Sequence, residues 1–147
     1  MDTFKEMVYQ KDRCDGFVLA DGIYKDHRYI VKSFGTHPTA YVQLNDDDPI
    51  YIEPLKFNHN DPEEVTYGSF PIECHGGLTY YECQLRVDNN DILPGHWVGW
   101  DYAHCEDYYG YDYDNPYYHT KKWTTKEMVN ECKNVIDQVV EYNEKEE

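Results

Sequence analysis

The stretch TTKEMVNECKNVIDQVVEY, residues 124–142, decides the fold that this sequence predicts. Its apolar residues recur at intervals of three and four, which is the spacing of one face of an α-helix. Thr124 and Glu127 have the spacing of a capping box, so the helix should begin here and run into the charged segment EYNEKEE. The predicted apolar stripe consists of Met128, Val129, Cys132, Val135, Ile136, Val139 and Val140.

The rest of the chain contains a sheet that such a helix can cover. Short runs of β-branched and aromatic residues alternate with turn formers such as Asp21-Gly22, in the order of a meander. The predicted strands are GFVLA (16–20), HRYIVKSF (27–34), AYVQL (40–44), IYIEP (50–54), FPIEC (70–74), GLTYYECQLRV (77–87) and HWVGW (96–100). We therefore expect an α+β fold in a single domain, residues 1–147, with a mainly antiparallel sheet covered by the C-terminal amphipathic helix. An alternative stays open, in which the apolar stripe binds a partner or forms the seam of a homo-oligomer.

The N-terminus carries a weaker helix signal. Thr3 and Glu6 have capping-box spacing, and the apolar residues Phe4, Met7 and Val8 share one helical face. We expect a short N-terminal helix that ends before the following Asp-Gly pair.

The chain is strongly acidic. It holds 29 acidic and 13 basic residues, a formal net charge of −16, and its pI is about 4.6. Such a charge opposes attraction to phosphate backbones and anionic bilayers, so we expect neither nucleic acid nor a membrane as a direct partner. Two interpretations stay open: a solubilising surface, or a surface that imitates the phosphate charge of DNA and occupies a basic groove on another protein.

Cysteine usage and the N-terminal composition point to a reducing compartment. The five cysteines form an odd set without a Cys-x-x-Cys pair, which argues against a disulfide framework and a zinc ribbon. The N-terminus shows no apolar stretch of signal-peptide length, and nowhere do about 18 apolar residues run together. We expect the protein in the cytoplasm.

The first candidate site stretch is CHGGLTY, residues 74–80. The paired Gly76 and Gly77 allow positive φ or the close approach of another group, and His75 and Thr79 flank them with polar side chains. The structural alternative is a tight turn beside a hydrogen-bonded histidine.

The second candidate stretch is WVGWDYAHCED, residues 97–107. Asp101, His104 and Asp107 are spaced by threes, so one helical turn or a tight loop would bring their side chains together. Two carboxylates and an imidazole can ligate a divalent metal or pair as acid and base. The structural alternative is a carboxylate that caps a turn beside a surface histidine.

Two polar segments should be surface loops, residues 56–69 and the Asp/Tyr-rich residues 107–118. The tyrosines of the second loop can stack on a planar ligand, form the rim of a protein interface, or fold back on the sheet as an aromatic lid. They are Tyr108, Tyr109, Tyr111, Tyr113, Tyr117 and Tyr118. The sequence has no phosphate-binding glycine loop, no Gly-x-Ser-x-Gly elbow and no His-Glu-x-x-His motif, so the familiar nucleotide and hydrolase classes lack support.

The order of GFVLA, HGGLTY, WVGWDYAHCED and a C-terminal helix resembles a family of small proteins encoded by tailed bacteriophages and prophages. The matching positions are His75, Gly76, Gly77, Thr79, Tyr80, Trp97, Gly99, Trp100, Asp101, Ala103, His104 and Asp107. The sequence departs from the pattern at Glu106, where the family usually has glycine. The resemblance implies a phage or prophage origin and a location in the host cytoplasm, and it carries no activity with it.

Three functions follow as hypotheses. The first is a binding module for a small polar ligand, such as a nucleotide-type defence signal, held by His75, Gly76, Gly77, Thr79, Tyr80, Trp100, Asp101, His104, Asp107 and Tyr108. The second is a metal-dependent hydrolase whose ligands His75, Asp101, His104 and Asp107 would suit zinc or manganese. The third is an acidic DNA mimic that inhibits a host defence protein.

Overall fold

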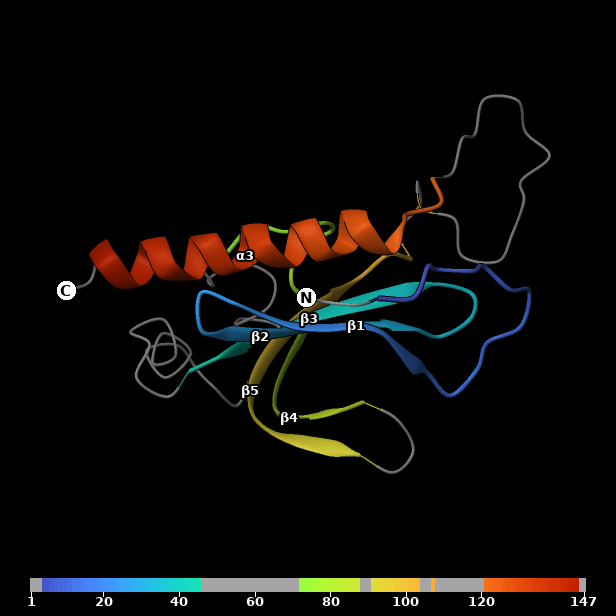
Figure 1. Ribbon diagram of the computed structural model, residues 1–147, viewed down its shortest axis with the longest axis horizontal. Helices are drawn as coiled ribbons and strands as arrows, with labels where there is room; N and C mark the ends of the chain where they lie inside the picture. Colours follow the sequence, from blue (N-terminus) through green and yellow to red (C-terminus); the bar gives the residue numbers. More distant parts are fainter. Residues whose placement is uncertain (1–3, 46–71, 88–90, 104–106, 108–120, 146–147) are drawn as a thin grey trace.

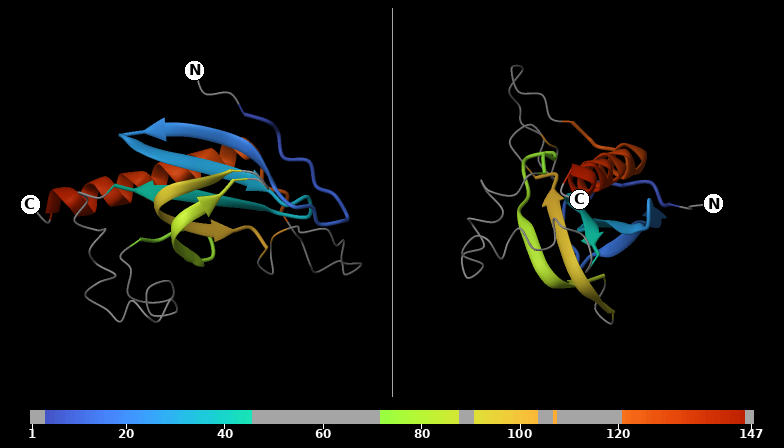
Figure 2. Two further views of the ribbon diagram at one scale, coloured as in Figure 1. Left: turned by 90° about the horizontal axis from the view of Figure 1, so that it is seen from below. Right: turned by 90° about the vertical axis from the view of Figure 1, so that its left-hand side faces the viewer.

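The computed structural model describes residues 4–45, 72–87, 91–103, 107 and 121–145. These residues form a five-stranded antiparallel sheet and one helix, which confirms the predicted α+β fold. The strands are β1 (Phe17–Tyr24), β2 (His27–Ser33), β3 (Pro38–Leu44), β4 (Tyr80–Arg86) and β5 (Ile92–Asp101), and their order in the sheet is β1-β2-β3-β5-β4. The helix is α3 (Thr125–Lys145), and it lies along one face of the sheet (Figures 1 and 2).

The predicted capping box and apolar stripe of α3 are both confirmed. The Glu127 amide donates to the Thr124 hydroxyl over 3.2 Å, and the Thr124 amide donates to the Glu127 carboxylate over 3.1 Å. Most residues of the stripe are fully buried, and they pack on the sheet side chains that face the helix. The sheet contributes Tyr29, Val31, Ala40, Val42, Leu44, Val98 and Trp100 to this core.

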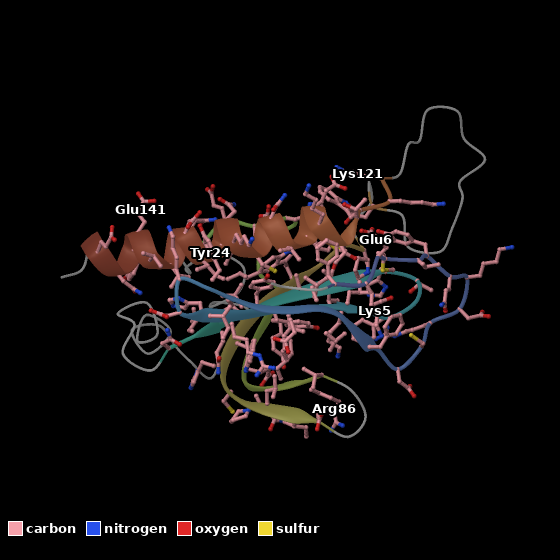
Figure 3. The ribbon with its side chains drawn as sticks, viewed as in Figure 1. Lys5, Glu6, Tyr24, Arg86, Lys121 and Glu141 are labelled. Carbon is pink, nitrogen blue, oxygen red and sulfur yellow. The ribbon has the colours of Figure 1, made fainter. Side chains whose placement is uncertain are left out.

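The opposite face of the sheet holds a second, smaller apolar cluster. It consists of Ile30, Tyr41, Leu85, Val87 and Trp97. Figure 1 shows the β4–β5 hairpin bending away from α3 on this side of the sheet, and Figure 3 labels Arg86 on the hairpin. The buried Lys32 of β2 donates to the Arg86 carbonyl over 2.7 Å, so the hairpin itself covers part of the face that no described helix covers.

The predicted turn at Asp21-Gly22 is wrong, because both residues lie inside β1. The chain turns instead at Lys25 and Asp26, which adopt φ angles of 48° and 63° without being glycines. Gly22 has a packing role, since a Cβ there would lie 2.4 Å from the Tyr29 hydroxyl. The glycine therefore marks a close contact inside the strand rather than its end.

The short N-terminal helix is not found in the described residues. Phe4 forms an isolated antiparallel bridge with Ala20, and the Lys5 amide donates to the Leu19 carbonyl over 2.8 Å. The edge of β1 offers backbone partners that compete with the first helical turn, and Val8 remains 65% exposed, so a helix would have gained little apolar burial here.

Two other strand predictions need revision. Residues 72–74 of the predicted strand 70–74 are not in a strand, although Ile72 is buried in the core on the helix side. The predicted strand 50–54 and the predicted loop 56–69 lie outside the described residues. Within the described residues, no helix combines the length and apolar content needed to span a membrane.

The packing of α3 predicts the effect of one truncation. Ile136 is fully buried, so Ile136→Ala should lower the free energy of unfolding by about 2–5 kcal/mol in urea denaturation followed by circular dichroism. The matched control is Asn130→Ala on the exposed side of the same helix, which should change it by less than about 0.5 kcal/mol. Equal effects of the two changes would contradict the packing of this stripe.

Candidate functional site

The two candidate stretches meet at His75 and Asp107. The His75 Nε2 atom lies 2.8 Å from one carboxylate oxygen of Asp107 and 3.0 Å from the other. Asp107 is only 2% exposed, and the Trp123 indole N–H donates to it over 2.8 Å. A buried carboxylate needs such donors, so His75 and Trp123 stabilise the placement of Asp107.

Aromatic rings surround this buried carboxylate. The His75 ring stacks on Tyr102 with centroids 4.7 Å apart and planes at 11°, and it meets the edge of Trp123 at 4.8 Å. The Tyr102 hydroxyl accepts the Trp100 indole N–H over 3.1 Å, and burial raises the pKa of Tyr102. We call His75, Tyr102, Asp107 and Trp123 the Asp107 cluster.

The sequence around His75 explains how the chain reaches the Asp107 cluster. Gly76 and Gly77 adopt φ angles of 69° and 82°, and the Gly77 amide donates to the Cys74 carbonyl over 3.0 Å, which forms the predicted turn. No atom lies within 4 Å of a Cβ placed on Gly77, so the backbone conformation, rather than a close neighbour, favours glycine there.

A side chain of α3 holds the segment that precedes this turn. The Gln138 amide group donates to the Glu73 carbonyl over 2.6 Å and accepts the Glu73 amide N–H over 2.7 Å. Both backbone groups of Glu73 are therefore bound by one helix residue, much as they would be by a neighbouring strand.

A pocket of about 350 Å³ lies beside β3, β4 and β5, and its described lining includes no member of the Asp107 cluster. Four residues predicted from the two candidate stretches line it, namely Thr79, Tyr80, Trp100 and Asp101. The first half of the chain contributes Arg13, Phe34, His37, Thr39 and Tyr41. The antiparallel register places Thr39 opposite Asp101, and Tyr80 opposite Gly99, which brings these segments together. We call this space the β3–β5 pocket.

The alternation of β5 separates Asp101 from the Asp107 cluster. Val98 and Trp100 face α3, so Asp101 lies on the other face of the sheet with Tyr41. The described residues therefore do not bring Asp101 together with His75 and Asp107. Asp101 instead accepts the Ala103 amide N–H over 3.1 Å and lines the β3–β5 pocket.

Burial and two charged residues, Arg13 and Asp101, determine the pKa of His37 in the β3–β5 pocket. Burial lowers the pKa of His37, the negative charge of Asp101 opposes this shift, and the positive charge of Arg13 adds to it. The Arg13 guanidinium lies 5.0 Å from the Phe34 ring centroid. Burial also raises the pKa of Tyr80 to about 12, so its phenol is neutral at physiological pH.

The Thr39 hydroxyl is a buried polar group without a hydrogen bond among the described residues. Its side chain is 7% exposed and lines the β3–β5 pocket. Burial raises the pKa of Tyr41, and the neighbouring Thr39 hydroxyl offsets part of this rise, but the two hydroxyls do not reach hydrogen-bonding geometry. Since buried hydroxyls are normally paired, Thr39 marks a position where a further polar partner fits.

The predicted metal site receives no support from its described members. In the part of the chain that the structure describes, no three His, Cys, Asp or Glu side chains come together as metal ligands would. His104, Tyr108 and the other tyrosines of the predicted aromatic loop lie outside that part. The metal interpretation therefore stays a prediction that depends on His104.

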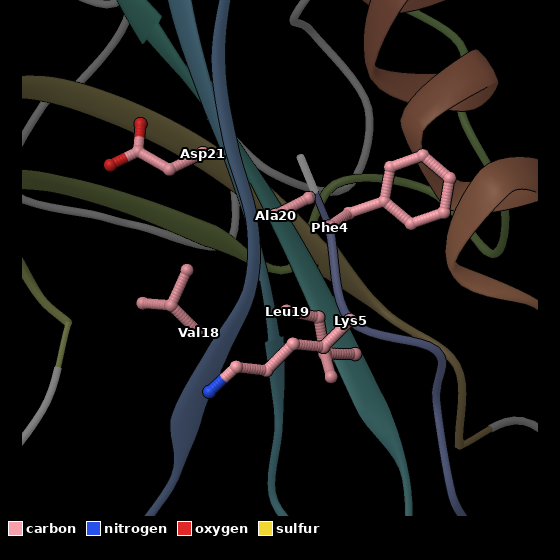
Figure 4. Close-up of a pocket in the computed structure, with 6 residues that line it drawn as sticks. All are labelled: Phe4, Lys5, Val18, Leu19, Ala20 and Asp21. Atoms are coloured by element: carbon pink, nitrogen blue, oxygen red, sulfur yellow. The ribbon is translucent and has the colours of Figure 1, made fainter. Parts of the chain in front are cut away.

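A second pocket, of about 300 Å³, lies where the N-terminal segment runs antiparallel beside β1 (Figure 4). It is lined by Phe4, Lys5 and β1 residues from Val18 to Asp21. Arg28 binds the Asp21 carboxylate through two hydrogen bonds, of 2.9 and 2.7 Å. No predicted site residue lines this pocket, so the β3–β5 pocket is the better candidate.

Comparisons of the chain with models of protein families, with curated protein sequences and with solved structures found no match.

The hydrogen bond from Trp123 to Asp107 predicts a coupled loss of stability. Trp123→Phe keeps a ring but removes the donor, so it should lower the free energy of unfolding by about 1–3 kcal/mol. The same change should cost much less when Asp107→Ala is already present, as a double-mutant cycle in urea would show. Equal costs in both backgrounds would mean that the two side chains are not coupled.

The charges of the β3–β5 pocket predict opposite shifts of the His37 pKa. In an NMR titration, His37 should titrate below its ordinary value of 6.5. Asp101→Asn removes a nearby negative charge and should lower this pKa further, whereas Arg13→Gln removes a positive charge and should raise it. Asp26→Asn, at the exposed turn between β1 and β2, is the control and should leave the pKa unchanged. Shifts of the same sign in the two pocket variants would contradict this arrangement.

Proposed function

We propose that this chain is a binding module that holds a small polar ligand in the β3–β5 pocket. The observation that carries the proposal is the buried Thr39 hydroxyl, which has no hydrogen bond among the described residues and lies in a pocket that also brings together Arg13, His37 and Asp101. Small-molecule sites combine apolar and aromatic walls with a few converging polar groups, and volumes of about 300–1,000 Å³ are usual for them. The β3–β5 pocket has this composition and lies at the lower end of that range.

The Asp107 cluster has a positioning role in this proposal. It anchors His75, and the turn at Gly76 and Gly77 then leads directly into Thr79 and Tyr80 of the pocket wall. The Thr79 amide donates to the Gly99 carbonyl over 3.0 Å, which joins the end of this segment to β5. Residues far from the ligand would in this way define one wall of its site.

The resemblance to phage and prophage proteins leads us to place this binding activity in the cytoplasm of a bacterial host. In that setting the ligand can be a small signal of host defence, which the protein would sequester. The described lining includes one side chain that is always cationic, Arg13, so a highly phosphorylated signal would need further donors.

The two other hypotheses lack a specific supporting observation. The hydrolase requires the metal site that depends on His104. The acidic inhibitor depends on charge clusters at residues 46–48, 61–64 and 144–147, of which the structure describes only Glu144 and Lys145. Both stay predictions from the sequence.

Native mass spectrometry of gently purified protein tests the proposed function. We expect a stoichiometric small organic molecule in the wild-type protein and its loss in Thr39→Phe, which fills the pocket with a ring. Ile23→Phe adds a ring at a site that is 70% exposed and should retain the molecule. The proposal fails if the protein carries no small molecule and no metabolite of a broad library raises its melting temperature. A bound metal ion would instead favour the hydrolase.

A further inference from the structure

The charges that line the β3–β5 pocket are balanced. Among the described lining residues, Arg13 is cationic and Asp101 is anionic, while the lowered pKa of His37 leaves its ring mostly neutral at pH 7. The other polar side-chain groups of the described lining are neutral, namely four hydroxyls and the Trp100 indole N–H, which donates to Tyr102. A ligand that matches this pocket therefore needs one group of each charge.

Arg13 can bind an anionic group. Among the described residues its guanidinium has no salt-bridge partner, although the chain as a whole is strongly acidic. It is held over the Phe34 ring, which leaves its N–H groups available for a planar carboxylate. A dianionic phosphate fits less well, because Asp101 lines the same small pocket and would repel it.

The opposite side of the pocket can bind a cationic donor. An ionised carboxylate has about four acceptor positions, so Asp101 can accept further hydrogen bonds besides that from Ala103. Tyr41 and Tyr80 meet edge to face, 5.1 Å between centroids, and their rings offer an apolar wall beside this carboxylate.

We infer that the ligand of the β3–β5 pocket is a zwitterion of amino-acid size with an aromatic side chain, whose carboxylate binds Arg13 and whose ammonium group binds Asp101. This inference rests on the proposed function and names its ligand class. The Thr39 hydroxyl would pair with one of the ligand's polar groups, and the aromatic side chain would lie against Tyr41 and Tyr80.

Three indole compounds test the charge requirement in calorimetric titrations at pH 7. L-tryptophan carries both charges, tryptamine only the ammonium group, and indole-3-propionate only the carboxylate. We expect L-tryptophan to bind at least about tenfold more tightly than either single-charge compound, because each of them lacks one of the two charged groups that would bind Arg13 and Asp101. Guanosine 5′-monophosphate, as the nucleotide probe, should bind more weakly than L-tryptophan.

Variants of the wild-type pocket test the residue assignments. Arg13→Gln and Asp101→Asn should each weaken L-tryptophan binding on the order of 10- to 100-fold. Arg13→Gln should also reduce the preference for L-tryptophan over tryptamine, which lacks the carboxylate, and Asp101→Asn should reduce the preference over indole-3-propionate, which lacks the ammonium group. Arg86→Gln and Asp26→Asn, both at exposed positions that do not line the pocket, should leave binding unchanged. Thr39→Val should weaken binding about tenfold without lowering the melting temperature of the free protein, since it removes a buried hydroxyl that has no hydrogen bond within the described part of the chain.

The outcomes separate this inference from the proposed function. Equal binding of the three indole compounds, or tighter binding of the nucleotide, would overturn the zwitterion while leaving a small-molecule pocket. A co-purified molecule of another class, with no binding of L-tryptophan, would also overturn the zwitterion and leave the proposed binding function in place. If no probe binds and native spectra show no bound molecule, both the inference and the proposed function fail.

Discussion

A single amphipathic helix covers one face of a five-stranded sheet, and the arrangement of the described chain depends on this packing. The helix α3 buries its apolar stripe against β1, β2 and β3 and, through Gln138, also holds the segment before His75. The other face receives no described helix and is partly covered by the β4–β5 hairpin and the buried Lys32. The β3–β5 pocket lies beside this second cluster, where the sheet side chains have no helix to pack against.

The sequence predicts an element well where its apolar residues repeat with the period of that element and are buried in the structure. The stripe of α3 repeats over the whole helix, so its position and capping box were readable from the sequence. The position of the turn after β1 was not readable from the sequence. Lys25 and Asp26 adopt positive φ there although neither is a glycine, and Gly22, where the turn was expected, instead leaves room for the Tyr29 ring inside the strand. The N-terminal capping pattern was misleading, since the edge of β1 binds the same backbone in an extended form.

The candidate site was predictable only in part, and strand geometry explains the limit. The sequence singled out His75, Asp101 and Asp107, but their spacing alone does not show that Asp101 lies on the opposite face of β5 from the side chains that pack against α3. Thr39 and Tyr41 join Asp101 because β3 pairs with β5, across a long interval of sequence. No local motif marks these residues, and Thr39 becomes a candidate only because its buried hydroxyl has no hydrogen bond among the described residues.

The contact between Phe4 and Ala20 has a consequence for solubility. The strand β1 is at the edge of the sheet, and edge strands expose backbone groups that can recruit strands of other chains. The extended N-terminal segment occupies some of these groups at Leu19 and Ala20, although it adds no named strand to the sheet. The segment that was expected to form a helix thus reduces the exposed backbone edge of β1, and it also joins this edge to α3, because the Lys5 carbonyl accepts the Thr125 hydroxyl over 2.6 Å.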